Sequence, residues 1–147
     1  MLLQAARDWL PSVGVKLPSA QFRDVGHNMV LVDTSVWINH LSIGDPDLNR
    51  LLTECEVICH EFIIGELACG GIKNRKEFLA LLDSLPASPV ITHEEYMYLL
   101  EKEKLMGKGI GFVDIHLLAS ARLSCISIWT EDKNLKTVAR SLKLSYV

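Results

Sequence analysis

Short apolar runs alternate with amphipathic stretches along the chain from Met29 onward. The runs are rich in Val and Ile and too short for helices, which is typical of strands buried on both faces. We expect strands at 29–32, 56–59, 90–91 and 125–129. Strands that alternate with helices favour a parallel sheet covered by helices, so the expected fold class is α/β.

The stretches between these runs carry the start and stop signals of helices. Pro46 is placed to open a helix, Gly70 follows the end of another, and Thr92 with Glu95 forms a capping box. We expect helices at 36–41, 47–54, 62–68, 74–85, 92–106, 114–123 and 134–142.

Residues 1–28 differ from the rest of the chain. Leu2–Leu10 could form one short amphipathic helix that stops at Pro11, and scattered Gly, Pro and polar residues follow. The segment is a native arm, an upstream piece of translated sequence or a leftover of cloning. We expect 1–28 to be an arm outside the core and 29–147 to be the folded domain.

Composition narrows the class of protein. The 147 residues are 49% hydrophobic and 22% charged, which indicates one soluble globular domain. No apolar run is long enough to cross a membrane, and no secretory signal is recognisable, so we expect reduced cysteines and a cytoplasmic location. The net charge of −3 argues against binding nucleic acid by charge alone, but it allows an enzyme that reaches phosphates through a cation.

Four acidic residues lie in apolar surroundings, where a solvated carboxylate is not expected. Taken singly, each has an ordinary alternative, as a helix cap or a partly exposed helix residue. Taken together, they lack basic neighbours in similar settings, and a shared Mg²⁺ or Mn²⁺ would compensate their charge. The four are Asp33, Glu66, Asp114 and Asp132.

Four segments resemble the successive acidic motifs of the PIN-domain ribonucleases, and most closely those of VapC-type toxins of bacterial toxin–antitoxin pairs. They are Met29–Leu41, Ile63–Cys69, Gly109–Ala121 and Trp129–Leu135. The resemblance covers nearly all of 29–147, in the right order. It implies a three-layer α/β/α fold with a central, mainly parallel sheet. It also implies a Mg²⁺- or Mn²⁺-dependent endoribonuclease that acts on RNA and is inhibited by a cognate antitoxin.

The resemblance also carries site roles onto this chain. It places the catalytic and metal-site acids at Asp33, Glu66, Asp114 and Asp132. Supporting hydroxyls are matched by Thr34 or Ser35 and by Thr130. Glu131 is a second acid beside Asp132 and leaves open which of the two completes the site. Our hypothesis is that the first three acids shape the metal site, that Asp132 completes it or orients a water, and that this water attacks the phosphodiester in line.

Other features have two interpretations each. Lys73 and Arg75 could hold RNA phosphates or could be a solvated helix start. Leucines at 41, 48, 51 and 52 suit a homodimer or antitoxin interface, or plain core packing. Two rival functions also stay open: a PIN-fold RNA-processing nuclease that is not a toxin, and a catalytically silent module that only binds a partner.

Overall fold

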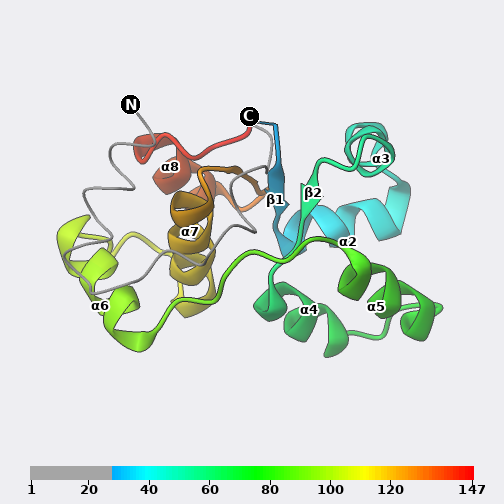
Figure 1. Ribbon diagram of the computed structural model, residues 1–147, viewed down its shortest axis with the longest axis horizontal. Coiled ribbons are helices and arrows are strands. Elements are labelled where there is room, and N and C mark those ends of the chain that lie inside the picture. Colours follow the sequence, from blue (N-terminus) through cyan, green and yellow to red (C-terminus); the bar gives the residue numbers. More distant parts are fainter. Residues whose placement is uncertain (1–27) are drawn as a thin grey trace.

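A three-stranded parallel sheet forms the centre of the molecule in the computed structural model, which describes residues 28–147 (Figure 1). The strand order is β2-β1-β3, with the strands β1 (Val30–Val32), β2 (Val57–Ile58) and β3 (Ser127–Trp129). The predicted arm at 1–28 lies outside the described residues except for Asn28.

Helices cover both faces of this sheet within residues 28–147. In Figure 1, α6, α7 and α8 lie on one side of the strands, whereas α2, α3, α4 and α5 lie on the other. The expected three-layer α/β/α architecture is therefore confirmed. The helices are α2 (Thr34–Ile43), α3 (Pro46–Thr53), α4 (Glu61–Ala68), α5 (Arg75–Ser84), α6 (His93–Lys102), α7 (Phe112–Ser124) and α8 (Lys133–Ser141).

The central strand is buried on both faces because helices cover both sides of the sheet. Every residue of β1 is at most 1% exposed. On the side of α7, burial is continuous from Ile115 to Ala121, so this helix is a core element rather than an amphipathic surface helix. The carboxyl ends of β1 and β3 meet at one edge, where the backbone N–H of Asp33 donates to Trp129 O at 2.9 Å. This edge positions the site described below.

The strand predicted at Val90 and Ile91 is wrong. The chain touches the sheet slightly earlier, through a single parallel bridge between Ala87 and Cys59. Cys59 N–H donates to Pro86 O and Ser88 N–H donates to Cys59 O, both at 2.8 Å. The pairing cannot extend in either direction, because Pro86 has no N–H to donate before the bridge and the partner chain enters α4 at Glu61 after it.

The leucines expected to form an interaction surface divide between core and surface. Leu48 and Leu51 are fully buried, so core packing explains them, and Leu52 is half-buried. Leu41 is 43% exposed on α2. Among the described residues, no helix has the length and apolar character needed to cross a bilayer.

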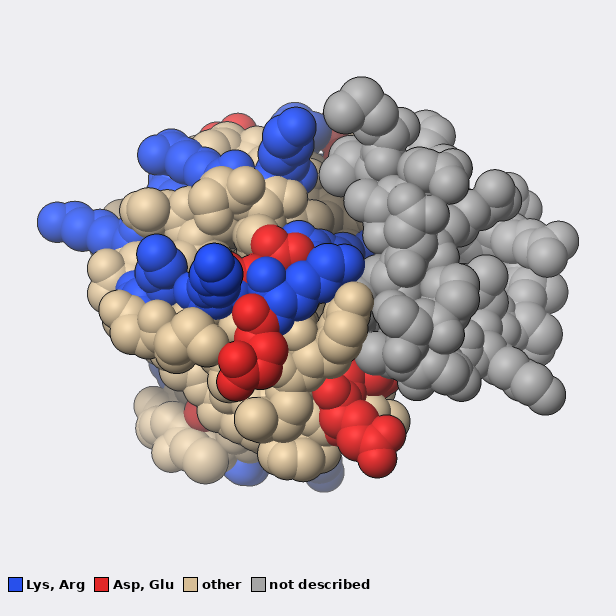
Figure 2. Space-filling view, turned by 90° about the vertical axis from the view of Figure 1, so that its left-hand side faces the viewer, with Lys and Arg blue, Asp and Glu red and all other residues tan. Residues whose placement is uncertain are grey.

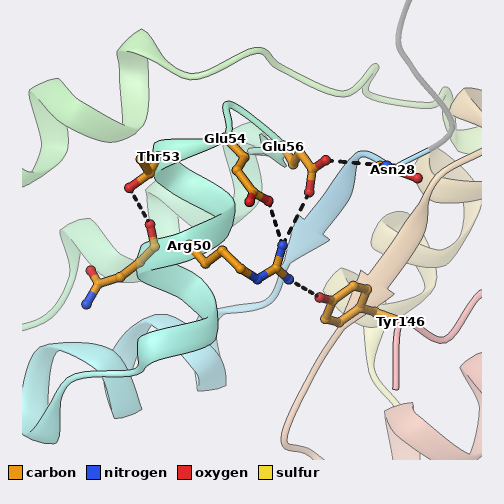
Figure 3. A network of polar contacts seen from close by, with 7 residues as sticks. Asn28, Arg50, Thr53, Glu54, Glu56 and Tyr146 are labelled. Carbon is orange, nitrogen blue, oxygen red and sulfur yellow. Dashed lines mark hydrogen bonds and ion pairs between the residues drawn. The ribbon is translucent and has the colours of Figure 1, made fainter.

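Arg50 on α3 is the centre of a polar network that ties this helix to both ends of the described chain (Figure 3). Its guanidinium lies 2.6 Å from Glu54 and 3.9 Å from Glu56, and it donates to the Tyr146 hydroxyl at 3.0 Å. Asn28 donates to Glu56 at 3.4 Å. Tyr146 N–H also donates to Ile128 O, so the network fixes the C-terminal segment beside β3.

Candidate active site

Asp33 lies where the central strand ends and α2 begins. It is the N-cap of α2 and is 7% exposed. Its Oδ2 accepts hydrogen bonds from the Ser35 hydroxyl at 2.7 Å, the Thr130 hydroxyl at 2.8 Å and the Ser35 N–H at 3.4 Å. No hydrogen bond from residues 28–147 reaches its Oδ1. The helix cap therefore occupies one oxygen of this carboxylate and leaves the other available.

Asp132 holds the matching position on the neighbouring strand, as the N-cap of α8. Its Oδ1 accepts from Leu135 N–H at 2.8 Å, while its own N–H donates to Thr130 Oγ1 at 3.0 Å. The adjacent acid faces another partner, because Glu131 accepts a hydrogen bond from the Trp129 indole at 3.2 Å. This geometry favours Asp132 over Glu131 as the fourth acid of the site.

Asp114 stands at the third position of α7 and is not an N-cap. Its Oδ2 accepts from Gly111 N–H at 2.8 Å, so the side chain at N3 bonds back to the N-cap residue at the start of the helix. Burial raises the pKa of Asp114, and the nearby negative charges of three carboxylates raise it further, against the effect of the Gly111 hydrogen bond. Those three carboxylates belong to Asp33, Asp132 and Glu66.

Glu66 reaches the same region from α4, on the other side of the sheet. Its Oε2 accepts from the Thr34 hydroxyl at 2.6 Å, and residue 34 directly follows Asp33. The side chain is exposed, and its second oxygen accepts no hydrogen bond from the described part of the chain. The fold thus brings the other three predicted acids within electrostatic reach of Asp114.

Three hydroxyl groups connect these acids. Ser35 and Thr130 lie 3.3 Å apart and both donate to Asp33, whereas Thr34 donates to Glu66. Ser35 also accepts from the N–H of Glu131 at 3.0 Å, which joins the ends of β1 and β3. All three predicted supporting hydroxyls therefore hold an acid in a fixed orientation.

The donor set fits a hydrated divalent cation. Within residues 28–147, none of the four acids forms an ion pair with Lys or Arg, and each has one carboxylate oxygen without a hydrogen bond. No three His, Cys, Asp or Glu side chains of this range are close enough to enclose a metal ion by themselves. Mg²⁺ binds proteins through one or two carboxylates and keeps several of its waters, so such a site does not require three side chains in contact with the ion.

The two basic residues predicted to bind substrate have other surroundings. Arg75 donates twice to Ala68 O, at 3.1 and 2.8 Å, and so caps the last turn of α4. Lys73 lines a cavity with Ile38 and Leu41. No contact joins either residue to the four acids within residues 28–147.

Two further lysines were not predicted to take part in the site. Lys133 directly follows Asp132, and Lys108 is next to Gly109, whose carbonyl accepts from the Asn134 side chain at 3.1 Å. Both lysines are exposed. Figure 2 shows Lys and Arg side chains gathered in a band on the side of the molecule where α6 and α8 lie. The signal in the sequence was the position of Lys133 directly after a predicted acid.

We expect Gly109→Ala to destabilise the protein more than Gly107→Ala. Both glycines have positive φ, +74° and +71°, where an L side chain costs roughly 1–2 kcal/mol. A Cβ at 109 would also lie 2.6 Å from Asn134 Nδ2, whereas a Cβ at 107 meets nothing within 4 Å. The clash should displace the Asn134 hydrogen bond and cost about 1 kcal/mol more in the free energy of unfolding, measured with urea. Equal losses in the two variants would contradict the packing of Asn134 on the loop.

Comparisons with known proteins identify the family of this chain. The PIN domain family model matches residues 30–141. Proteins named Ribonuclease VapC32, from two strains of Mycobacterium tuberculosis, are 48% identical to this chain over 109 residues. The aligned part is 74% of this chain and 88% of each relative. The chain therefore belongs to the PIN-domain family and, within it, to the VapC type.

Proposed function

We propose that this protein is a metal-dependent endoribonuclease that hydrolyses RNA phosphodiester bonds and acts as the toxin of a toxin–antitoxin pair. The observation that carries the proposal is the convergence of Asp33, Glu66 and Asp132 on Asp114, whose pKa their negative charges raise and where a bound cation would offset the combined charge. The similarity to relatives that are named ribonucleases supports the RNA substrate.

The four acids would hold Mg²⁺ or Mn²⁺ through the oxygens that carry no hydrogen bond. A divalent cation in such a site lowers the pKa of water and offsets the charge that builds on the phosphate. The chain itself fixes the orientation of two of these carboxylates. The hydroxyl groups of Thr130 and Ser35 donate to Asp33, and that of Thr34 donates to Glu66. Asp132, fixed at the N-terminus of α8, completes the site or accepts a hydrogen bond from the attacking water.

The whole chain has a net charge of −3, so its overall charge does not attract RNA. Local basic residues would therefore have to guide RNA to this acidic centre. Lys133 directly follows Asp132, Lys108 precedes Asp114 in the glycine-rich loop, and both lysines are exposed. Lys73 and Arg75 remain predicted phosphate contacts.

We further propose a cognate antitoxin and a second copy of this chain as partners. The surface that supports this is apolar: Ile38, Leu41 and Ile43 on α2 are 53%, 43% and 80% exposed. Ile38 and Leu41 also line the cavity beside Ile72. We place the activity in the cytoplasm, where RNA is available, and all four cysteines are free thiols.

Cleavage of a panel of structured RNAs, including tRNA and rRNA fragments, tests this function directly. We expect cleavage with Mg²⁺ or Mn²⁺, none with EDTA, and a higher melting temperature when Mn²⁺ is added, because a ligand that binds only the folded state stabilises it. No cleavage together with an unchanged melting transition would favour the silent binding module. Growth arrest on expression, relieved by the product of an adjacent small gene, would separate a toxin from an RNA-processing nuclease.

A further inference from the structure

Phe112 is an exposed aromatic residue at the first position of α7. Its side chain is 54% exposed, although its ring contacts three others. The Phe112 ring centroid lies 6.1 Å from that of Phe62, and the two rings are stacked with an interplanar angle of 25°. It lies 4.9 Å from the ring centroid of Tyr96 and 4.4 Å from that of His116. Phe62 and Tyr96 are half-buried, so Phe112 is the outermost ring of this cluster.

His116 forms the floor of the cluster and lacks the contacts that a histidine normally makes. It is 3% exposed, and neither ring nitrogen has a hydrogen-bond partner in the part of the chain that the structure describes. Burial lowers the pKa of His116, so the ring is neutral at pH 7. The aromatic rings of Phe62 and Tyr96 pack at 4.8 and 5.1 Å from it. His116 thus acts as a fourth flat ring that supports the other three.

This aromatic cluster borders the acidic site on two helices. Phe62 lies one turn before Glu66 on α4, so their side chains share a helix face. Phe112 lies two residues before Asp114, and the Asp114 carboxylate bonds back to the N–H of Gly111, immediately before Phe112. A nucleotide whose phosphate lay at the acids would have its base within reach of these rings.

We propose that Phe112, supported by Phe62, Tyr96 and His116, is a platform on which one base of the RNA substrate stacks beside the scissile phosphate. The inference rests on the proposed function and adds a base-binding subsite to it. Aromatic side chains stack on bases of any sequence, and each such contact contributes strongly to single-strand binding. A protein partner is a poorer fit, since a stable protein interface needs roughly 1,000 Å² or more, and the cluster exposes mainly one ring.

Binding and cleavage of one RNA by three variants test the platform. The probe is a fluorescein-labelled, mixed-sequence single-stranded RNA, with EDTA for binding and Mg²⁺ for cleavage. Phe112→Leu should weaken binding about tenfold and raise KM more than it lowers kcat. Phe112→Trp should restore both values. Leu81→Ala, an equally exposed apolar change on α5, should leave both unchanged.

The outcomes separate the platform from the proposed function. Wild-type affinity in Phe112→Leu overturns the platform, and so does wild-type RNA binding too weak to measure. Loss of self-association with unchanged RNA binding also overturns it and assigns the ring to a protein interface. If wild-type protein cleaves no RNA while Phe112→Leu still weakens binding, the platform stands and the nuclease proposal fails.

Discussion

Replacing Asp114 by asparagine is expected to lower metal-dependent RNA cleavage by at least about 100-fold while the fold persists. Asparagine keeps an oxygen that can accept the hydrogen bond from Gly111 N–H, so the start of α7 should survive. The substitution removes the negative charge that three other carboxylates surround, and with it much of the attraction for a divalent cation. Initial cleavage rates with Mg²⁺ and circular dichroism at the same protein concentration measure the two effects.

Two control variants make this result specific. Asp45 is the N-cap of α3, and its carboxylate, like that of Asp114, accepts hydrogen bonds from backbone N–H groups at a helix start, here those of Asp47 and Leu48. Asp45→Asn therefore repeats the chemical change in a cap away from the site and should cleave like the wild type. Glu131→Gln should also retain cleavage, because its carboxylate faces the Trp129 indole. Full activity of Asp114→Asn would refute the proposed site.

Lowering the pH from 7 to 4 is expected to remove about 3 kcal/mol of stability through His60 alone. This side chain is fully buried, and burial, with a smaller effect of His116, lowers the pKa of His60 to about 4. Its Nδ1 accepts from Phe62 N–H at 3.0 Å and its Nε2 lies 3.1 Å from Ser120 Oγ. Protonation would turn Nδ1 into a donor that faces another donor. The unfolded chain takes up the proton near pH 6.5, so this stability is present above that pH and is lost as the pH falls toward 4.

The variant that isolates this effect is His60→Asn. Asparagine can still cap α4, but it does not titrate between pH 4 and 7. Urea unfolding at several pH values should show a flatter pH dependence for His60→Asn than for the wild type. His93→Asn, a change at an exposed histidine, should follow the wild type. Identical slopes for His60→Asn and the wild type would show that His60 does not resist protonation.

The sequence predicted all three strands of the sheet. β1 and β2 are wholly apolar and buried, and β3 is so apart from the half-buried Ser127, because a central parallel sheet covered by helices meets little solvent on either face. The stretch at 90–91 has the same composition and forms no strand, because the chain beyond Cys59, which would have to pair with it, enters α4 at Glu61. Apolar content predicts which segments are buried. It does not show whether a neighbouring strand has free N–H and C=O groups with which such a segment can pair.

The acids of the candidate site could be predicted from the sequence, but the residues that surround them could not. Asp33 and Asp132 follow strands, and parallel strands bring their carboxyl ends to one edge. The aromatic cluster could not be predicted in this way, because Phe62, Tyr96 and Phe112 come from three helices whose relative placement depends on the packed core. The same holds for Leu48 and Leu51, which a helical pattern could assign to a core or to an interface.

Each acid of the proposed site both supports the fold and carries negative charge that a metal-dependent reaction would need. One oxygen of Asp33, Asp114 and Asp132 anchors the start of a helix, and asparagine does this as well as aspartate. Replacing one aspartate of the proposed site by asparagine would therefore abolish the proposed activity without unfolding the protein. One nucleotide change would turn such a protein into a relative that keeps the fold and only binds its partner. We expect such relatives to carry asparagine at these positions.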